Sequence, residues 1–289
     1  MVKLLDFIPF RGRKRYGGYE LLEQIARGGM SRIWRARAPE TGQIFAVKIL
    51  TPESVEVIDM YRRFFETEEG QVALALDHPN VIKTHEYGRG RKAEYYLVMD
   101  YVHGPNLEVL IARGSPRVKQ HQFSLVMQIG AGLRYIHQQG LVHRDFCPKN
   151  VLFGEDCVAK IIDFGLTIPL SLKERSGVLR AGTASFMAPE QVRGRPVDER
   201  TDIYAYGLSC YEILTGRRPL PGARDVGQRM QDQLNLEPLP LRRLAPHLPE
   251  EMEQIIEKCI AKEPAMRYKS MDGAMKDMRV AVEIAQSRK

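Results

Sequence analysis

Ten residues near the middle of the chain govern the interpretation of the whole sequence: His143-Arg144-Asp145-Phe146-Cys147-Pro148-Lys149-Asn150-Val151-Leu152. In a tight loop, an acid and an amide five positions apart can divide two tasks. One accepts a proton from a hydroxyl and the other ligates a divalent cation. Thirteen residues after Asn150, Asp163-Phe164-Gly165 follows two isoleucines. This segment predicts a second hard oxygen ligand at the end of a short hairpin, where Mg²⁺ can bind.

Two motifs nearer the N-terminus point to phosphate. Ala26-Arg27-Gly28-Gly29-Met30-Ser31-Arg32-Ile33 lies between two strand patterns, and small residues there let backbone N–H groups approach phosphate oxygens. An ordinary glycine hairpin is the alternative. Phe45-Ala46-Val47-Lys48 places a cation in an apolar strand. The Lys48 ammonium could bind phosphates, or its aliphatic stem could simply lie along apolar surface with the charge in water. The phosphate role requires a carboxylate partner, and the next helix offers three acids that could otherwise form a solvated face: Glu66, Glu68 and Glu69.

The surrounding hydrophobic patterns predict two structural regions. Residues 19–102 show five strand patterns around one charged helix near Pro52–Leu76; the strands are Leu21–Ala26, Ile33–Ala38, Ile44–Leu50, Val81–Gly88 and Tyr95–Tyr101. From about residue 105 the patterns are mostly helical, with helices expected at Ser124–Gln139, Asp202–Leu214, Pro249–Ala261 and Ser270–Gln286. Ser124 is the expected cap of the first and Gly140 its expected end. We therefore expect an α+β fold.

Composition excludes several classes of protein. The chain has 289 residues, 44% hydrophobic and 27% charged, and no apolar run reaches the ~18 residues of a membrane span. Its four cysteines lack the spacing of a disulfide framework or a structural zinc site, so we expect reduced thiols and a cytoplasmic location. More than half of the net charge of +7 falls in residues 1–18, a basic N-terminal extension. Because no nucleic-acid module is present, we expect no nucleic-acid partner.

The five motifs, with Gly182-Thr183-Ala184-Ser185-Phe186-Met187-Ala188-Pro189-Glu190 as the last, occur in an order and spacing that resemble protein kinases. Three short segments most resemble the eukaryotic-like serine/threonine kinases of bacteria: residues 28–30, 187–191 and 197–202. The resemblance covers residues 19–285 and implies a bilobal fold, with a small β-rich N-lobe (19–102) and a larger helical C-lobe (103–289). Asp202 and Arg267 match two further family landmarks. Arg267 is expected to form a buried structural ion pair with Glu190.

The resemblance implies an ATP site with Mg²⁺, or alternatively Mn²⁺. Lys48 would contact the α- and β-phosphates, with Glu69 as its partner. Asn150 and Asp163 would hold the metal, while Asp145 would accept the proton of the substrate hydroxyl. Met99 matches the gatekeeper position, and the Asp100 carbonyl and Val102 N–H would meet adenine. The remaining positions expected around the nucleotide are Ile25, Ala26, Gly28, Gly29, Ser31, Ile33, Ala46 and Leu152.

The sequence departs from the family in two loops. Ala26 and Ser31 replace two glycines of the phosphate loop, and we expect a stiffer lid rather than a lost site. Cys147 stands where serine/threonine kinases usually carry a lysine that touches the γ-phosphate, and Lys149 stands where they usually carry glutamate. We hypothesise that Lys149 supplies the missing cation from two positions along. The alternative is that Lys149 only faces solvent and that phosphoryl transfer is impaired. Lys149 would also disfavour basic residues upstream of the acceptor.

The implied activity is transfer of the γ-phosphoryl group of Mg·ATP to serine or threonine hydroxyls of protein substrates, with autophosphorylation. Thr183, in the Ser/Thr-type pattern before Ala188-Pro189-Glu190, would hydrogen-bond Asp145 and shape the acceptor site. Ala73 and Thr84 stand where the family usually carries larger apolar residues of its regulatory spine. Because poor packing there would weaken the active position of the helix, an activating partner or a homodimer would complete the active state. The competing interpretations are a kinase-like pseudoenzyme acting as scaffold or ATP sensor, and a small-molecule phosphotransferase.

Overall fold

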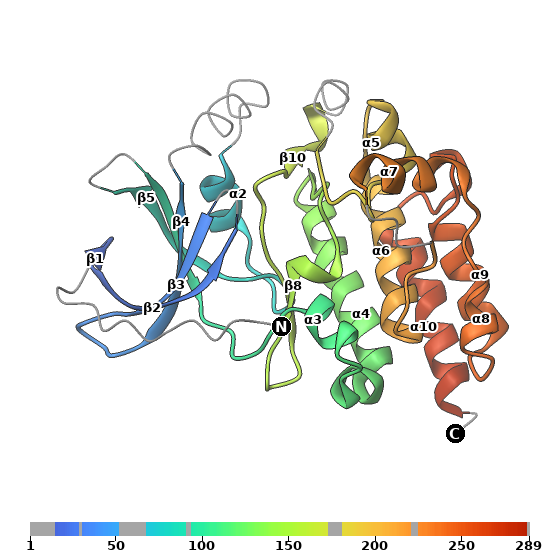
Figure 1. Cartoon of the computed structure of the whole chain (residues 1–289), viewed down its shortest axis with the longest axis horizontal. Coiled ribbons are helices and arrows are strands. Elements are labelled where there is room, and N and C mark those ends of the chain that lie inside the picture. The colour runs from blue at the N-terminus through green and yellow to red at the C-terminus, as the bar shows by residue number, and fades with distance from the viewer. Residues whose placement is uncertain are drawn as a thin grey trace. The chain divides into compact units, whose positions relative to one another are not determined.

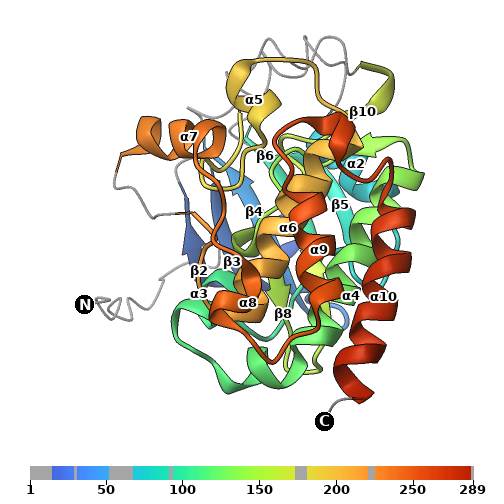
Figure 2. The same cartoon turned by 90° about the vertical axis from the view of Figure 1, so that its right-hand side faces the viewer.

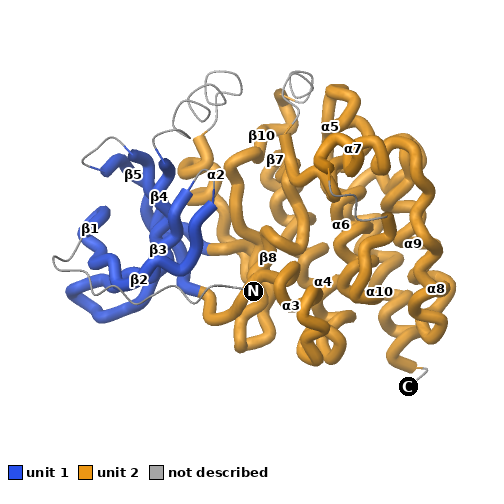
Figure 3. Tube along the Cα trace, in the orientation of Figure 1, with its two compact units in different colours: residues 1–60, 83–101 blue, residues 61–82, 102–289 orange. Residues whose placement is uncertain are grey.

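A computed structural model describes residues 15–28, 31–51, 68–90, 94–172, 181–220 and 225–287. The chain divides into two compact units, which are coloured separately in Figure 3. Unit 1 comprises Met1–Met60 and Lys83–Tyr101, and unit 2 comprises Tyr61–Ile82 and Val102–Lys289. The expected α+β class is confirmed, because unit 1 is built from strands and unit 2 mainly from helices.

Unit 1 is a six-stranded antiparallel sheet (Figure 1). In spatial order its strands are β1 (Arg15–Tyr16), β2 (Tyr19–Arg27), β3 (Ser31–Arg37), β4 (Ile44–Leu50), β6 (Tyr95–Asp100) and β5 (Thr84–Arg89). Ala36, Val47 and Val98 are fully buried in its core. The β1–β2 turn uses Gly17 (φ 52°) and Gly18 (φ 85°), because a tight two-residue hairpin requires left-handed backbone. Arg15 and Tyr16, expected in the N-terminal extension, therefore belong to the sheet.

The fourth predicted strand begins later than expected. We expected a strand over Val81–Gly88, and β5 begins only at Thr84. Val81 instead forms an isolated parallel bridge with Ile161 in unit 2. The predicted strand was too long at its start, because the apolar residue Val81 continues the strand pattern but pairs with the β8–β9 hairpin instead of the sheet of unit 1. The predicted charged helix near Pro52–Leu76 lies partly outside the described residues, and its described end is α2 (Glu69–Ala75) of unit 2.

Unit 2 contains all of the described helices, together with two short strand pairs and two described 3₁₀ turns. Its helices are α2, α3 (Leu107–Ala112), α4 (Pro116–Gln138), α5 (Pro189–Arg193), α6 (Glu199–Thr215), α7 (Val226–Asn235), α8 (Leu241–Leu244), α9 (Glu250–Cys259) and α10 (Met271–Ser287). Its short strands are β7 (Leu141–Val142), β8 (Val151–Phe153), β9 (Ala159–Ile161) and β10 (Ile168–Pro169), and its 3₁₀ turns are Pro148–Asn150 and Pro264–Met266. β7 pairs with β10, and β8 pairs with β9.

Helix α6 forms the centre of unit 2. Every residue from Thr201 to Leu214 is buried, which is the pattern of a helix surrounded by other elements. It contacts α4 and α9, and α10 contacts all three (Figure 2). The packing is close enough that a Cβ on Gly207 would lie 2.7 Å from Cβ of Cys259, so only glycine fits there. None of the described helices is both long and apolar enough to cross a membrane.

The start of α4 differs from the prediction. We expected Ser124 to cap this helix, but it begins at Pro116 after Ser115, and the Ser124 hydroxyl accepts a hydrogen bond from Gln128 within it. A proline in the first turn is a start signal that the apolar periodicity alone did not include. The expected end is confirmed, because the helix stops at Gln138 and Gly140 adopts φ 71°.

Candidate active site

The loop that follows β7 is held by a carboxylate from the central helix. Arg144 has φ 68°, a left-handed conformation that is costly for a residue with a side chain. Asp202 of α6 compensates, because its Oδ1 accepts a 2.9 Å hydrogen bond from Arg144 N–H and its Oδ2 a 2.7 Å bond from His143 N–H. His137 Nε2 lies 2.9 Å from the same Oδ2.

The charge on Asp202 is stabilised although the side chain is buried. Burial by itself would raise the pKa of this carboxyl, but the contacts with His137 and with His143 outweigh it, and the pKa is lowered. An ionised carboxylate forms stronger hydrogen bonds with backbone N–H groups than a neutral acid does. The loop backbone is therefore fixed by a charge that sits in the middle of unit 2.

Asp145 is oriented by donors on both of its carboxylate oxygens. Oδ1 accepts a 2.6 Å hydrogen bond from the backbone N–H of Thr183, and Oδ2 accepts a 3.0 Å bond from Asn150 Nδ2. Asn150 Nδ2 also donates to the Asp145 carbonyl at 2.8 Å. A carboxylate has about four lone-pair sites, so room remains for a substrate hydroxyl. The bond from Thr183 comes from its main chain, while its hydroxyl lies 3.7 Å from Cys147 Sγ.

The β8–β9 hairpin brings Asn150 and Asp163 to the same end. Val151 pairs with Ile161, and the next rung is a 2.9 Å hydrogen bond from Ile162 N–H to the Asn150 carbonyl. Asp163 follows directly with φ 68°, and its Oδ1 accepts a 3.4 Å bond from Gly165 N–H. Asp163 is exposed, and the Asn150 amide nitrogen is engaged with Asp145, which leaves the side-chain oxygen of Asn150 as a ligand. These two hard oxygens fit Mg²⁺, which keeps several waters of its own.

Glu69 lies beside the same turn. A Cβ placed on Gly165 would be 3.4 Å from Glu69 Oε2 and 3.4 Å from Asp163 Oδ1. Glu69 is the first residue of α2, and Glu68 precedes the helix. Glu66 lies outside the described residues. The pairing of Glu69 with Lys48 stays a prediction.

Cys147 and Lys149 have opposite environments. Cys147 is fully buried, and burial, followed by the charge of Asp145, raises the pKa of its thiol to about 12. It is therefore a neutral packing residue at the position where the family carries a lysine. Lys149 is exposed, and its ammonium has no ion-pair partner among the residues that the structure describes.

Five of the unit 1 residues expected near a nucleotide, Ala26, Ile33, Ala46, Lys48 and Met99, share one face of the sheet. In the β-ladder, Ala26 lies opposite Ile33, Ile33 opposite Lys48, and Ala46 opposite Met99. Because side chains alternate along a strand, Ala46 and Lys48 point to the same face. The remaining unit 1 positions are described as well: Ile25 is 45% exposed, Gly28 N–H donates to the Ser31 carbonyl at 2.9 Å, and Asp100 Oδ1 lies 2.7 Å from His85 Nε2.

The other nucleotide positions fall elsewhere. Val102 and Leu152 belong to unit 2, where Leu152 lies in β8 and forms an isolated bridge with Asn106. Gly29, together with most of the basic extension, lies outside the described residues.

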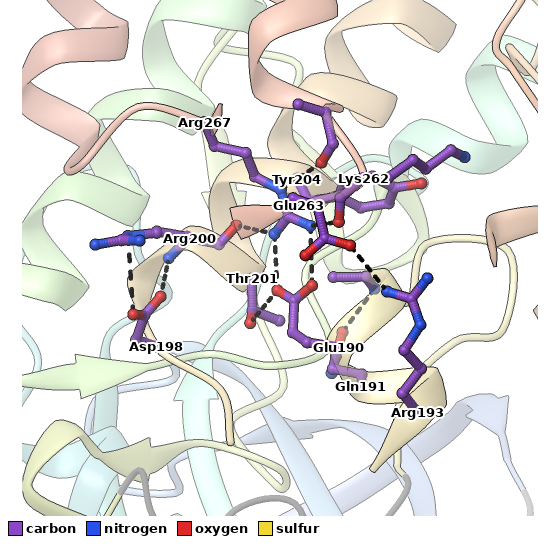
Figure 4. Close-up of polar contacts among 12 residues, drawn as sticks. Glu190, Gln191, Arg193, Asp198, Arg200, Thr201, Tyr204, Lys262, Glu263 and Arg267 are labelled. Atoms are coloured by element: carbon purple, nitrogen blue, oxygen red, sulfur yellow. Dashed lines mark hydrogen bonds and ion pairs between the residues drawn. The ribbon is translucent and has the colours of Figure 1, made fainter. Parts of the chain in front are cut away.

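A buried ion pair anchors the segment that follows Thr183. The Arg267 guanidinium donates to both carboxylate oxygens of Glu190, at 2.7 and 2.8 Å (Figure 4). The Arg267 side chain is 0% exposed and that of Glu190 is 5% exposed. Thr201 Oγ1 donates a third bond to Glu190, and the carbonyls of Ala261 and Arg200 accept from Arg267. Every strong donor and acceptor is satisfied, as a buried pair requires.

Gln191 has a structural role that no sequence pattern predicted. Its amide nitrogen donates to the carbonyl of Arg144 at 2.8 Å, and its amide oxygen accepts from Ala188 N–H at 2.9 Å. It thereby connects the loop that contains Arg144 and Asp145 to the segment before α5. Nothing in the sequence marks this glutamine, because the contact joins residues 47 positions apart.

Comparison with known proteins agrees with this geometry. The model of the protein kinase domain matches residues 19–278. The chain is 32% identical over 275 residues to serine/threonine-protein kinase PrkC of Bacillus subtilis, an alignment that covers 94% of this chain and 42% of PrkC. It is 34% identical over 260 residues to serine/threonine-protein kinase PknA of Mycobacterium tuberculosis, covering 88% of this chain and 59% of PknA. It thus spans less than two thirds of these relatives. With most of its length matched, the chain belongs to the protein kinase family.

Proposed function

We propose that this chain transfers the γ-phosphoryl group of ATP to serine or threonine hydroxyls of protein substrates, itself included. The observation that carries the proposal is the Asp145 carboxylate, oriented by Asn150 and by the Thr183 backbone. A carboxylate held in one orientation can accept the hydroxyl proton without reorganising as the reaction proceeds. The named serine/threonine kinases among its relatives support the same chemistry.

The other residues have electrostatic tasks. Asn150 and Asp163 would hold Mg²⁺, or alternatively Mn²⁺, which would neutralise charge on the phosphates. Lys48 would bind the phosphates and Lys149 would place a positive charge near the transferring group. Phosphoryl transfer needs positioning and charge neutralisation rather than covalent catalysis, so these few groups are enough. The cysteines form no disulfides in the described chain, which fits a cytoplasmic location.

The decisive experiment incubates the protein with Mg·ATP and maps phosphorylated residues by mass spectrometry. We expect phosphoserine or phosphothreonine in the native protein and none in Asp145→Asn or Asp163→Asn. The matched control is Asp272→Asn, which changes a carboxylate on α10 that is 65% exposed and should keep full activity. A native protein that binds ATP but transfers no phosphate to itself or to a general acceptor such as casein would instead be a pseudoenzyme.

A further inference from the structure

A cavity of about 280 Å³ lies in unit 2, outside the candidate active site. It forms where the end of α3, the first turns of α4, the end of α6 and the residues after α8 meet. Its lining includes Ile111, Val118, Ile213 and Leu214, each at most 6% exposed. The cavity therefore has a largely apolar interior.

The size of the cavity corresponds to a small organic molecule. An apolar cavity of about 150 Å³ is large enough to hold benzene. The cavity next to α4 is larger, at about 280 Å³, and has room for an unbranched chain of about eight carbons. Because its interior is apolar, hydrocarbon rather than water is the favourable filling.

One polar side chain in the lining is available to a ligand. Gln122 is 7% exposed, and its side-chain amide forms no hydrogen bond with the described residues but keeps contact with solvent. Water can hydrogen-bond this amide when the cavity holds no ligand. A ligand group that accepts a hydrogen bond would satisfy the amide nitrogen of Gln122.

The charge around this amide is positive. Lys119 precedes Gln122 by three residues, which puts both side chains on one face of α4. Its ammonium has no ion-pair partner in the described part of the chain. The cavity lining contains no Asp or Glu, and Ser115 and His247 add further hydrogen-bonding groups. A negatively charged group is therefore favoured over a positive or neutral one.

We propose that this cavity binds a small amphipathic carboxylate. Its hydrocarbon part would pack against Ile111, Ile213 and Leu214, and its carboxylate would accept a hydrogen bond from Gln122 and face the Lys119 ammonium. The site is independent of the proposed phosphoryl transfer, because it shares no residue with the candidate active site.

Octanoate is the probe for this site, and isothermal titration calorimetry of the full chain is the measurement. We expect octanoate to bind at least tenfold more tightly than the neutral 1-octanol, because a charged hydrogen bond separates them. Gln122→Leu should weaken octanoate binding about tenfold or more. Lys119→Glu should weaken octanoate binding and strengthen binding of octylammonium, since it reverses the only formal charge in the lining.

The control is Lys276→Glu, which makes the same charge change on an exposed position of α10 and should leave octanoate binding unaltered. Circular dichroism would establish that each variant is folded; Lys119 is exposed, so its variant carries the test if Gln122→Leu misfolds. Failure of octanoate to bind the native protein at millimolar concentrations would overturn the proposal. So would equal binding of octanoate and octanol, or octanoate binding that Lys119→Glu leaves unchanged.

Discussion

The Oδ1 atom of Asp202 accepts a 2.9 Å hydrogen bond from the backbone N–H of Arg144, across 58 residues of sequence. The bond holds Arg144 in left-handed backbone one residue before the candidate base, Asp145. A helix buried along nearly its whole length thus determines the shape of the loop that would perform the chemistry.

Replacing Asp202 should weaken the hydrogen bonds that hold the backbone of His143 and Arg144 to α6. Asp202→Asn keeps the size of the side chain but removes its charge and turns an acceptor into a donor that faces N–H groups. We expect the free energy of unfolding at pH 7 to fall by about 3 kcal/mol, because charged hydrogen bonds contribute about 1.5–3 kcal/mol each. Urea unfolding would measure it, with Asp272→Asn as the exposed control.

The same carboxyl predicts a pH dependence. Its pKa is lowered from the usual 3.8, so its contribution to stability is present above about pH 4 and is lost as the pH falls through the native value. The native protein should therefore lose stability more steeply below pH 4 than Asp202→Asn does. If the unfolding free energies of the two proteins fell equally steeply below pH 4, Asp202 would not carry this contribution.

The buried Glu190–Arg267 pair should be far more sensitive than a neighbouring exposed pair. Glu190→Ala leaves a fully buried guanidinium without its counter-ion, and we expect a loss of about 3–5 kcal/mol in unfolding free energy. Arg193 and Glu263 form the matched exposed pair at 3.6 Å, and Glu263 is 60% exposed. Glu263→Ala should cost less than about 1 kcal/mol. Similar losses in both variants would contradict the argument from burial.

Lys149 should affect catalysis and leave stability alone. Its side chain is exposed, so Lys149→Ala should unfold at the native urea concentration. If it supplies charge to the transferring phosphoryl, kcat should fall about tenfold to 100-fold. Lys269→Ala, another exposed lysine outside the site, is the control. Unchanged phosphoryl transfer in Lys149→Ala would mean that this lysine does not replace the one missing at Cys147.

Thr84 offers a stabilising substitution. It is 1% exposed, lies opposite Met99 in the sheet, and its hydroxyl has no hydrogen-bond partner among the residues that the structure describes. Thr84→Val keeps the shape and removes the unpaired group, so unfolding free energy should rise by about 1–2 kcal/mol. Thr41→Val is the contrast, since the exposed Thr41 hydroxyl accepts a bond from Gln43 N–H. A less stable Thr84→Val protein would indicate that its hydroxyl is satisfied in solution.

Cysteine labelling would test the environment of Cys147. Because its pKa is raised to about 12, almost no thiolate exists at pH 8, and the thiol is also shielded from reagents. Cys157 is partly exposed. Iodoacetamide followed by mass spectrometry should modify Cys157 long before Cys147 in the folded protein, and both equally in urea. Rapid labelling of folded Cys147 would show that the loop opens.

Local patterns were sufficient for much of the fold. Strands β2, β3, β4 and β6 and the helices near residues 202–214, 249–261 and 270–286 were predictable because each has a hydrophobic period of its own. Errors occurred where partners in space decided the outcome. Val81 continues an apolar run yet pairs with Ile161, and α4 extends eight residues before Ser124 because Pro116 starts it.

The sequence by itself determined the identity and order of the proposed reactive groups, because Asp145, Asn150 and Asp163 lie within 19 residues and are joined by short local elements. Only the tertiary structure decided how those groups are held. Asp202 and Gln191 reach the loop through hydrogen bonds that span dozens of residues, and Cys147 becomes an inert packing residue by burial. Burial and long-range hydrogen bonds depend on how helices pack, and that packing has no signature in a local stretch of residues.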